Sequence, residues 1–352
     1  MTLTQLQEPL GAPWQRPLKG RLDQLVVESE VLAANPLGDP HRRPLYVYSS
    51  PGVAARNATD VASVYVLQGF TGQLDAWLGR SAFEPTMIER LDAMFGDAGN
   101  PCPDAVVVFV DAWTSLGGAQ FLNSTAIGDY TDYICDEVVP FVDANYSTDA
   151  RSQRRAVAGK SSGGYGAMVL PMLRPDTFGA LASHAGDALF EVCYLPDFAK
   201  AARALRDNFD GSLDAFKQQF AERDRFDHGH DGDVLNMYAM AAAYSPDPDH
   251  PTEVLLPFDL RTGRLIPDVW ELWLAHDPVR MAPRHADALR GLRRVYLDAG
   301  RADEYFLDLG AQAFAAELTT LGVHHTLELF AGGHGGMTYR YPPAIRELLV
   351  SL

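Results

Sequence analysis

The stretch AVAGKSSGGYGAM, residues 156–168, matches two sequence patterns that predict different chemistry. Gly159-Lys160-Ser161 resembles the end of a phosphate-binding loop, GxxxxGK[ST], whose first glycine would stand at position 154. The chain has Arg154 there, which argues against a loop that wraps its amides around a phosphate. The second pattern is Gly-x-Ser-x-Gly, a sharp turn between a strand and a helix that exposes a serine hydroxyl.

Two adjacent serines compete for the centre of this turn, and the flanking residues decide between them. The turn crowds the backbone on both sides of the serine, so glycine is expected two residues before it and two residues after it. Ser161 has Gly159 and Gly163 at those positions, whereas Ser162 would have Lys160 on its leading side. We therefore predict that Ser161 is the nucleophile and that Ser162 offers the next backbone N–H.

A serine hydroxyl is a poor nucleophile, so it needs a base, and the base needs an orienting carboxylate. With this turn, the acid and then the histidine are expected after late strands. Asp303 stands in the turn that follows the apolar run RRVYLDAG, with Glu304 and Asp298 as competitors. His334 stands among four glycines in AGGHGG, directly after the run HTLELF. We predict that Asp303 orients His334 and that His334 is the base.

A tetrahedral intermediate also needs backbone donors for its oxyanion. The Ser162 amide is one predicted donor, and the amide of Phe70, in the loop QGFTG after an early strand, is the other. Aromatic and polar residues that follow the strands are candidates for substrate contact, although burial in the core is their commoner role. These candidates are Trp113, Asn123, Tyr165, Trp270 and Trp273.

Short apolar runs alternate with helix-like stretches along most of the chain. Runs such as VVVFV are continuously apolar, as in strands that are buried on both faces of a parallel sheet. The alternation predicts an α/β fold with a mostly parallel central sheet and helices on both faces. The expected strands are 23–34, 44–50, 62–68, 104–111, 154–159, 179–185, 293–300 and 325–330, with the first two antiparallel to each other. The expected helices are 76–95, 129–146, 163–173, 304–322 and a C-terminal helix from about 342.

The alternation stops between residues 187 and 287, a stretch that is rich in helix formers and aromatic residues. We interpret it as a helical insertion within one domain of residues 1–352. Both of its ends should emerge near the edge of the sheet that carries the nucleophile. The sequence therefore predicts a cap over the site, with a structural buttress away from the site as the alternative.

Composition excludes several classes of partner. The 352 residues carry a formal net charge of −17, which disfavours nucleic acid and anionic membranes because their binding proteins present basic patches. The three cysteines include no CxxC pair, and the polar segments 228–233 and 247–250 are expected to be solvated loops, so no metal and no cofactor are predicted. The N-terminal residues lack a signal-peptide pattern, so a cytoplasmic protein is expected. Whether the chain forms a homo-oligomer stays open.

With these residues in hand, the chain resembles the esterase D-like branch of the α/β-hydrolases. That branch includes S-formylglutathione hydrolases, enterochelin esterases and antigen 85-type mycolyl transferases. The motifs that carry the resemblance are GKSSGGYGA, GRADEY, GGHGG and LQGFTG. The resemblance implies the α/β-hydrolase fold and the same five site residues. It also implies a serine esterase acting on a small carboxylic ester or thioester. The alternatives are an acyltransferase of the same fold and a hydrolase fold that only binds. The insertion is longer than in compact members, so the substrate of the family does not carry over.

Overall fold

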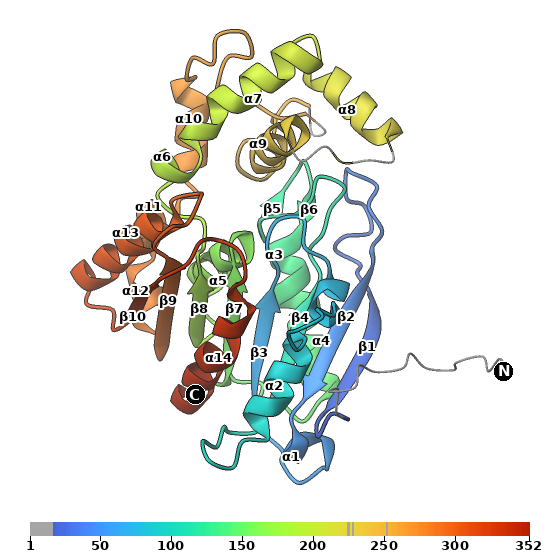
Figure 1. Cartoon of the computed structure of the whole chain (residues 1–352), viewed down its shortest axis with the longest axis vertical. Helices are drawn as coiled ribbons and strands as arrows, with labels where there is room; N and C mark the ends of the chain where they lie inside the picture. The colour runs from blue at the N-terminus through green and yellow to red at the C-terminus, as the bar shows by residue number, and fades with distance from the viewer. Residues whose placement is uncertain (1–16, 224–225, 227–228, 251–252) are drawn as a thin grey trace, which may run out of the picture.

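A twisted eight-stranded sheet forms the centre of the protein (Figure 1). The computed structural model describes residues 17–223, 226, 229–250 and 253–352. The strand order is β1-β2-β4-β3-β7-β8-β9-β10. The strands are β1 (Arg21–Glu28), β2 (Arg42–Ser49), β3 (Ala62–Leu67), β4 (Ala105–Val110), β7 (Arg155–Lys160), β8 (Ala180–His184), β9 (Arg294–Gly300) and β10 (Thr326–Phe330), and a separate small hairpin joins β5 (Asn123–Ser124) to β6 (Gly128–Asp129).

The sheet is mostly parallel, as the sequence predicts. The pairings β4-β3, β3-β7, β7-β8, β8-β9 and β9-β10 are parallel, and only the pairings of β2 with β1 and with β4 are antiparallel. All residues of β3 and β4 are buried, which explains their continuously apolar sequences. Because the parallel strands share one direction, the loops that follow β3, β4, β7, β8 and β9 meet at a single edge.

Helices cover both faces of the sheet and divide the core into two layers. The alternate strand residues Tyr65 and Val157 face one layer, and Val64 and Ala158 face the other. The first layer is covered by α5 (Ser162–Leu173), α13 (Leu307–Thr320) and the continuous helical run of α3 (Tyr130–Asp132), a π-helical segment (Tyr133–Val138) and α4 (Val139–Asn145). The second layer is covered by α2 (Met87–Phe95) and α14 (Tyr341–Ser351).

The first strand is shorter than the sequence predicts. It ends at Glu28, whereas an apolar run continues to residue 34. The carboxylate of Glu137, far along the chain, accepts hydrogen bonds from the N–H groups of Glu30 and Val31 and from the hydroxyl of Ser29. These bonds hold the next residues in a turn, so the strand cannot continue.

The helix expected at 76–95 is also wrong, because the segment forms two separate pieces. A 3-10 helix spans Leu74–Leu78, and α2 begins only at Met87. Thr86 caps α2 through a hydrogen bond from the Glu89 N–H, and the Glu89 side chain accepts from the Thr86 N–H. This reciprocal cap fixes where the second helix starts.

The helices of the segment 187–287 are α6 (Phe190–Cys193), α7 (Leu195–Asn208), α8 (Leu213–Glu222), α9 (His230–Tyr244), α10 (Pro267–Leu274) and α11 (Pro278–Met281), followed by a 3-10 turn (Ala282–His285) and α12 (Ala286–Arg290). The part of this segment from α6 to α10 lies beyond the ends of the strands, whereas its last helices, α11 and α12, pack against α5 on one face of the sheet (Figure 1). Figure 1 draws α7, α8, α9 and α10 above the same edge of the sheet at which the strand-ending loops meet. No helix among the described residues is both long and apolar enough to cross a membrane.

Aromatic residues hold the insertion together and join it to the sheet layer. The Trp273 ring packs edge-on against Tyr194 at 5.6 Å and Phe198 at 5.6 Å, and its Nε1 donates to the Ser245 hydroxyl at 2.8 Å. From α5, the Tyr165 ring contacts Tyr244 of α9 at 5.8 Å. The insertion therefore shares its core with α5 rather than standing apart from it.

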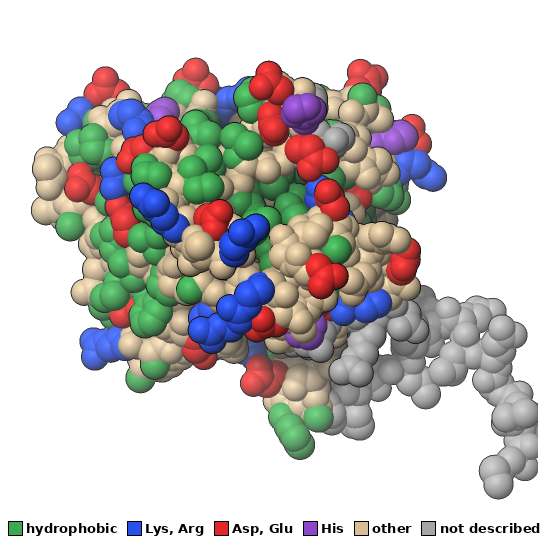
Figure 2. All heavy atoms as spheres, turned by 90° about the horizontal axis from the view of Figure 1, so that it is seen from above, with side chains coloured by type: hydrophobic (Ala, Val, Ile, Leu, Met, Phe, Trp, Pro, Cys, Tyr) green, Lys and Arg blue, Asp and Glu red, His purple; other side chains and the backbone are tan. Residues whose placement is uncertain are grey.

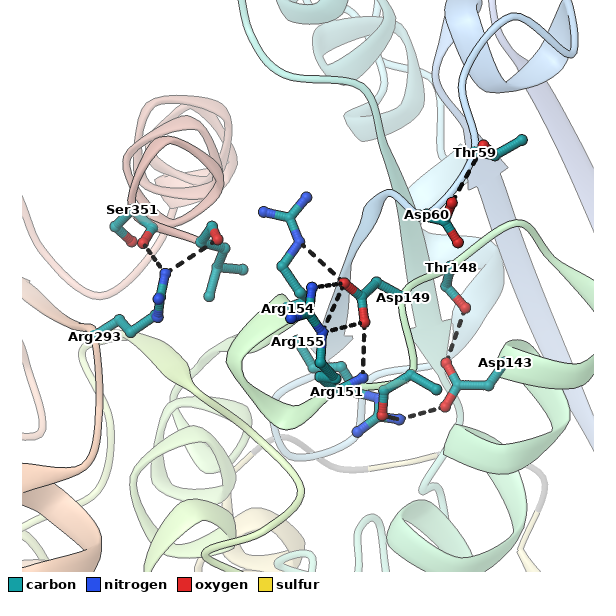
Figure 3. Close-up of polar contacts among 12 residues, drawn as sticks. Thr59, Asp60, Asp143, Thr148, Asp149, Arg151, Arg154, Arg155, Arg293 and Ser351 are labelled. Atoms are coloured by element: carbon teal, nitrogen blue, oxygen red, sulfur yellow. Dashed lines mark hydrogen bonds and ion pairs between the residues drawn. The ribbon is translucent and has the colours of Figure 1, made fainter.

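Ion pairs fix the opposite end of β7. Figure 3 shows Asp149 between Arg151 and Arg154, and Arg155 beside Asp143. Arg155 and Asp143 are both well shielded from solvent, and Arg155 also donates to the Ala150 carbonyl. These contacts anchor the start of the strand whose other end carries Ser161.

His276 makes the insertion sensitive to acid. Burial lowers the pKa of its imidazole to about 4, with a further contribution from the charge of Arg284, and the ring stacks on Tyr244 at 5.4 Å. An unfolded histidine binds a proton near pH 6.5, so the unfolded state takes up protons first as the pH falls and stability is lost between about pH 6.5 and 4.

We predict that the wild-type protein loses about 1–2 kcal/mol more free energy of unfolding between pH 7 and pH 5 than His276→Gln does, because glutamine does not titrate. Urea unfolding of both proteins at the two pH values measures this difference. Equal losses would show that His276 does not couple protonation to folding.

Candidate active site

Ser161 occupies a strained turn between β7 and α5. Its backbone has φ 58° and ψ −127°, a conformation that non-glycine residues rarely adopt. Two hydrogen bonds hold it there: the Ser161 N–H donates to the His184 carbonyl at 2.9 Å, and the Tyr165 N–H donates to the Ser161 carbonyl at 2.8 Å. The turn therefore presents the serine at the carboxyl edge of the sheet.

The flanking glycines leave no room for a side chain. A Cβ at Gly159 would lie 2.2 Å from the Gly163 carbonyl oxygen, and one at Gly163 would lie 2.3 Å from the Leu67 carbonyl oxygen. Both neighbours are backbone atoms of the sheet and the turn, so they cannot move aside cheaply. The turn brings the first residues of α5 against the end of β3 at a distance that only glycine allows.

Three side chains from distant parts of the sequence form a hydrogen-bonded chain at this edge. His334 Nε2 lies 3.1 Å from Ser161 Oγ, and His334 Nδ1 lies 2.8 Å from Asp303 Oδ2. Ser161 follows β7, Asp303 follows β9 and His334 follows β10, so each comes from a loop at the same end of the sheet. The arrangement permits proton transfer from the serine hydroxyl to the imidazole.

Asp303 is placed to stay ionised. Burial opposes its charge, but the hydrogen bond from His334 and the N–H groups of Tyr305 and Leu307 outweigh that cost and hold its pKa below the ordinary value. The Tyr305 N–H lies 2.9 Å from Asp303 Oδ1 and the Leu307 N–H lies 3.4 Å from it. With one oxygen occupied by amides, the other is directed at the imidazole.

The two competing carboxylates lie elsewhere. Asp298 is fully buried and binds His184 Nδ1 at 2.7 Å and Arg340 Nε at 2.8 Å. Glu304 Oε2 accepts the backbone N–H of His334 at 2.8 Å, a contact that sequence reasoning missed. Glu304 thus fixes the histidine loop, while only Asp303 of the three contacts the imidazole.

The predicted oxyanion donors, the amides of Phe70 and Ser162, belong to residues at the same cleft as Ser161. Ser162 begins α5, and Phe70 stands in the loop after β3; both residues line the same cleft as Ser161. In the part of the chain that the structure describes, neither backbone N–H is used in a hydrogen bond to another residue. Both are therefore available to a ligand oxygen.

A cleft of about 640 Å³ opens above these residues. Its sheet side includes Phe70, Trp113, Lys160 and Tyr305. The insertion supplies the other wall, with Asp187, Cys193, Tyr194, Asp197, Phe220, Phe226, Gly232, Asp233, Leu235 and Asn236. Figure 2 views the molecule from this end, where charged side chains of both signs surround exposed hydrophobic ones.

Of the five predicted substrate contacts, Trp113 alone lines this cleft. Tyr165 is buried in the core and donates its hydroxyl to the His276 carbonyl at 3.1 Å. Trp270 and Trp273 are buried in the aromatic core of the insertion. Asn123 is exposed on the β5–β6 hairpin and accepts the Asp132 N–H at 3.2 Å. None of these four residues lines the cleft: the three aromatic residues fill the core, which is their commoner role, and Asn123 lies on an exposed hairpin.

Sequence reasoning missed a polar floor beside Ser161 and Ser162. Asp187 Oδ2 accepts the Tyr194 hydroxyl at 2.8 Å and Gln120 Nε2 at 3.2 Å, and it lies 3.5 Å from the Ser162 hydroxyl. Burial raises the pKa of Asp187, although these hydrogen bonds partly offset the effect. The signal in the sequence was a carboxylate directly after the apolar run of β8.

The polar segment 228–233 lies partly outside the described residues, which exclude His228. Its residues from His230 onward form the first turn of α9 rather than a loop, and Asp231 pairs with Arg223 at 2.7 Å. Within the described ranges, no group of three or more His, Cys, Asp or Glu side chains is placed to hold a metal ion.

A family model covers most of the chain and includes the whole site. The model named Esterase, described as "Putative esterase", matches residues 64–341. The chain belongs to the esterase family. No curated protein matches the chain.

Solved structures of esterases share the fold of this family member. A ferulic acid esterase is 15% identical with a TM-score of 0.57, and the alignment covers 95% of this chain and 97% of that one. The S-formylglutathione hydrolase of Agrobacterium tumefaciens is 14% identical, with a TM-score of 0.57 and coverage of 96% and 98%. The fluorophosphonate-binding serine hydrolase FphF of Staphylococcus aureus is 14% identical, with a TM-score of 0.56 and coverage of 94% and 97%. These likenesses confirm the α/β-hydrolase fold.

The tight turn gives a direct test of the site geometry. We predict that Gly163→Ala loses at least a hundredfold in kcat/KM on a small ester, because the added methyl would displace the Leu67 carbonyl and move Ser161 from its partners. Gly335→Ala is the matched control, since its Cβ would meet no atom within 4 Å. Steady-state kinetics of both variants, with circular dichroism to check folding, decides the matter. Near-normal activity of Gly163→Ala would contradict the geometric account.

Proposed function

We propose that this esterase hydrolyses a small carboxylic ester or thioester through an acyl-enzyme on Ser161. The observation that carries the proposal is the hydrogen-bonded chain from Ser161 through His334 to Asp303. A base 3.1 Å from the hydroxyl and an ionised carboxylate behind that base supply what a serine nucleophile requires.

In the first half-reaction, His334 Nε2 takes the proton of Ser161 as Oγ attacks the carbonyl carbon. The carbonyl oxygen becomes an oxyanion and accepts hydrogen bonds from the Phe70 and Ser162 amides. His334 then gives the proton to the leaving oxygen or sulfur, and the acyl group stays on Ser161. Asp303 stabilises the imidazolium but does not take its proton.

In the second half-reaction, a water molecule attacks the acyl-enzyme. His334 accepts a proton from the water, and the same amides stabilise the second oxyanion. The proton returns to Ser161 Oγ as the acid product leaves. No step requires a metal or an organic cofactor.

The variants at the two adjacent serines test the nucleophile. Ser161→Ala should reduce kcat on a small activated ester by about 10⁴-fold or more and should abolish labelling by a fluorophosphonate. Ser162→Ala should keep most of both, because only its backbone N–H is assigned a role. A labelled Ser161→Ala protein would refute the assignment, and a wild-type protein that cleaves no ester of a broad panel would favour a binding role instead.

We further propose that residues 187–287 act as a cap that limits substrate size and restricts water. Phe220 of α8 and Leu235 of α9 face the cleft opposite Ser161. An enclosed cleft lowers the local water content and strengthens the oxyanion contacts. This feature also favours the acyltransferase alternative, which product analysis with an added alcohol acceptor distinguishes from hydrolysis.

The cap proposal predicts a change in selectivity on Phe220→Ala. The ratio of kcat/KM for bulky to short acyl esters should rise about tenfold, because the truncated side chain opens the cleft. Leu272→Ala is the control: Leu272 belongs to the same insertion, is 44% exposed and does not line the cleft. Kinetics across an ester series of graded acyl length measures the ratio. An unchanged ratio in Phe220→Ala would contradict the role of this wall.

A further inference from the structure

Lys160 stands directly before the nucleophile and faces the cleft. It is the last residue of β7, its side chain is partly buried, and it lines the cleft together with Ser161 and His334. Among the described residues that line this cleft, it is the one lysine or arginine. The residue therefore places a positive charge within the substrate site of a strongly acidic protein.

The Lys160 ammonium has no ion-pair partner in the described part of the chain. No carboxylate of a described residue lies within 4.0 Å of its Nζ, and no described group forms a hydrogen bond with it. The nearby acids are occupied elsewhere. Asp197 binds Lys200 at 2.7 Å, Asp303 binds His334, and Asp187 accepts from Tyr194 and Gln120.

Two opposing effects act on this ammonium. Burial lowers its pKa, while the carboxylates of Asp303, Asp187 and Glu304 raise it from beyond contact distance. When a cation is partly removed from water and has no direct partner, little offsets the free-energy cost of its lost hydration. An anionic group of a ligand in the cleft would supply the missing contact and would gain a charge-assisted hydrogen bond.

The position of Lys160 indicates which half of an ester would meet it. His334 must hand its proton to the leaving oxygen, so the leaving group lies on the histidine side of Ser161. Asp303 and Glu304, two of the three charges that act on Lys160, belong to the loop that fixes His334. Asp187, beside Ser162, lies at the polar floor described above. Lys160 thus shares the cleft with His334, and two of the three carboxylates that act on its ammonium belong to the loop beside that histidine.

We propose that Lys160 is a specificity-determining residue that binds a carboxylate on the leaving-group half of the substrate. The inference rests on the proposed function, since a leaving group exists only if Ser161 attacks an ester. The substrate class is then an acyl ester or thioester of a hydroxy- or mercapto-carboxylic acid. The product that departs first carries the anion, and the acyl group stays on the enzyme.

Two pairs of isosteric esters test the charge and its position. The first pair carries the charge on the alcohol half: 4-acetoxybutanoate against 4-acetoxybutanamide. The second pair carries it on the acyl half: the methyl ester of succinate as its monoanion against methyl succinamate. The ratio of kcat/KM for carboxylate to carboxamide is measured in each pair at pH 7.5 by product analysis.

Wild-type enzyme should prefer the carboxylate in the first pair only. In Lys160→Met this ratio should fall roughly tenfold to a hundredfold, the usual range for loss of a hydrogen bond to a charged group. Lys160→Arg should retain most of the preference. Lys217→Met is the matched control, because that lysine is ion-paired to Glu253 at 3.2 Å and does not line the cleft.

The outcomes separate this inference from the proposed function. If the wild type cleaves none of the four esters and no other small ester, the esterase proposal itself fails. If it cleaves the carboxamides but Lys160→Met has the same ratio as wild type in the first pair, the role of Lys160 is refuted. A carboxylate preference confined to the second pair would likewise overturn the assignment to the leaving group. Turnover of the carboxamide by each variant is the internal check that the site is folded.

Discussion

The strained, positive-φ backbone of Ser161 is the constraint on which the site depends. A residue at φ 58° and ψ −127° is held only because its N–H is bonded to β8 and its carbonyl to the first turn of α5. Both flanking positions must be glycine, because a Cβ at either would collide with backbone oxygens. The parallel sheet supplies the rigid frame, and the strain places the hydroxyl above the edge where the other loops converge.

A buried charged network extends that frame beneath the turn. His184 accepts the Ser161 N–H through its carbonyl, and its imidazole binds Asp298 of β9, which in turn binds Arg340. Arg340 belongs to the 3-10 turn that follows the His334 loop. Burial opposes the charge of Asp298, but the hydrogen bonds from His184 and Arg340 and the charge of Arg340 hold its pKa below the ordinary value. Through these contacts, the strand beside the nucleophile and the segment after the histidine share one buried anchor.

The sequence predicted the elements whose signals are local. Continuous apolar runs identified the inner strands, and paired glycines distinguished Ser161 from Ser162. It could not predict where β1 ends, because the Glu137 carboxylate that stabilises the following turn lies over a hundred residues away. The sequence also could not show which aromatic residues of the insertion are buried and which line the cleft. Trp273 and Phe220 are both large and aromatic, and only the packing of the helices buries Trp273 and leaves Phe220 in the cleft. The contact of Glu304 with the His334 amide was missed for the same reason, because it forms only when two loops that are distant in the sequence meet in the fold.

The cleft has Ser161 and His334 at the edge of the sheet, and its walls include polar, apolar and charged side chains. Asp187 and Tyr194 make its floor polar, Phe220 and Leu235 make the insertion side apolar, and Lys160 adds a cation next to Ser161. Such a site suits a small ester with a polar or charged group better than a long hydrocarbon chain. The insertion supplies one wall of the cleft, so under the proposed function the selectivity would depend on a segment that the motifs around Ser161, Asp303 and His334 do not describe.

The most direct test of the central claim is to trap the covalent intermediate on the wild-type enzyme. The protein is mixed with an activated ester, quenched in acid within milliseconds to seconds, digested and mapped by mass spectrometry with fragmentation between the adjacent serines. The account predicts one acyl group per active chain, attached to Ser161, appearing before steady-state turnover. Acylation of Ser162 or of another residue, or turnover of the ester without any acylated species even when deacylation is slowed, would contradict it.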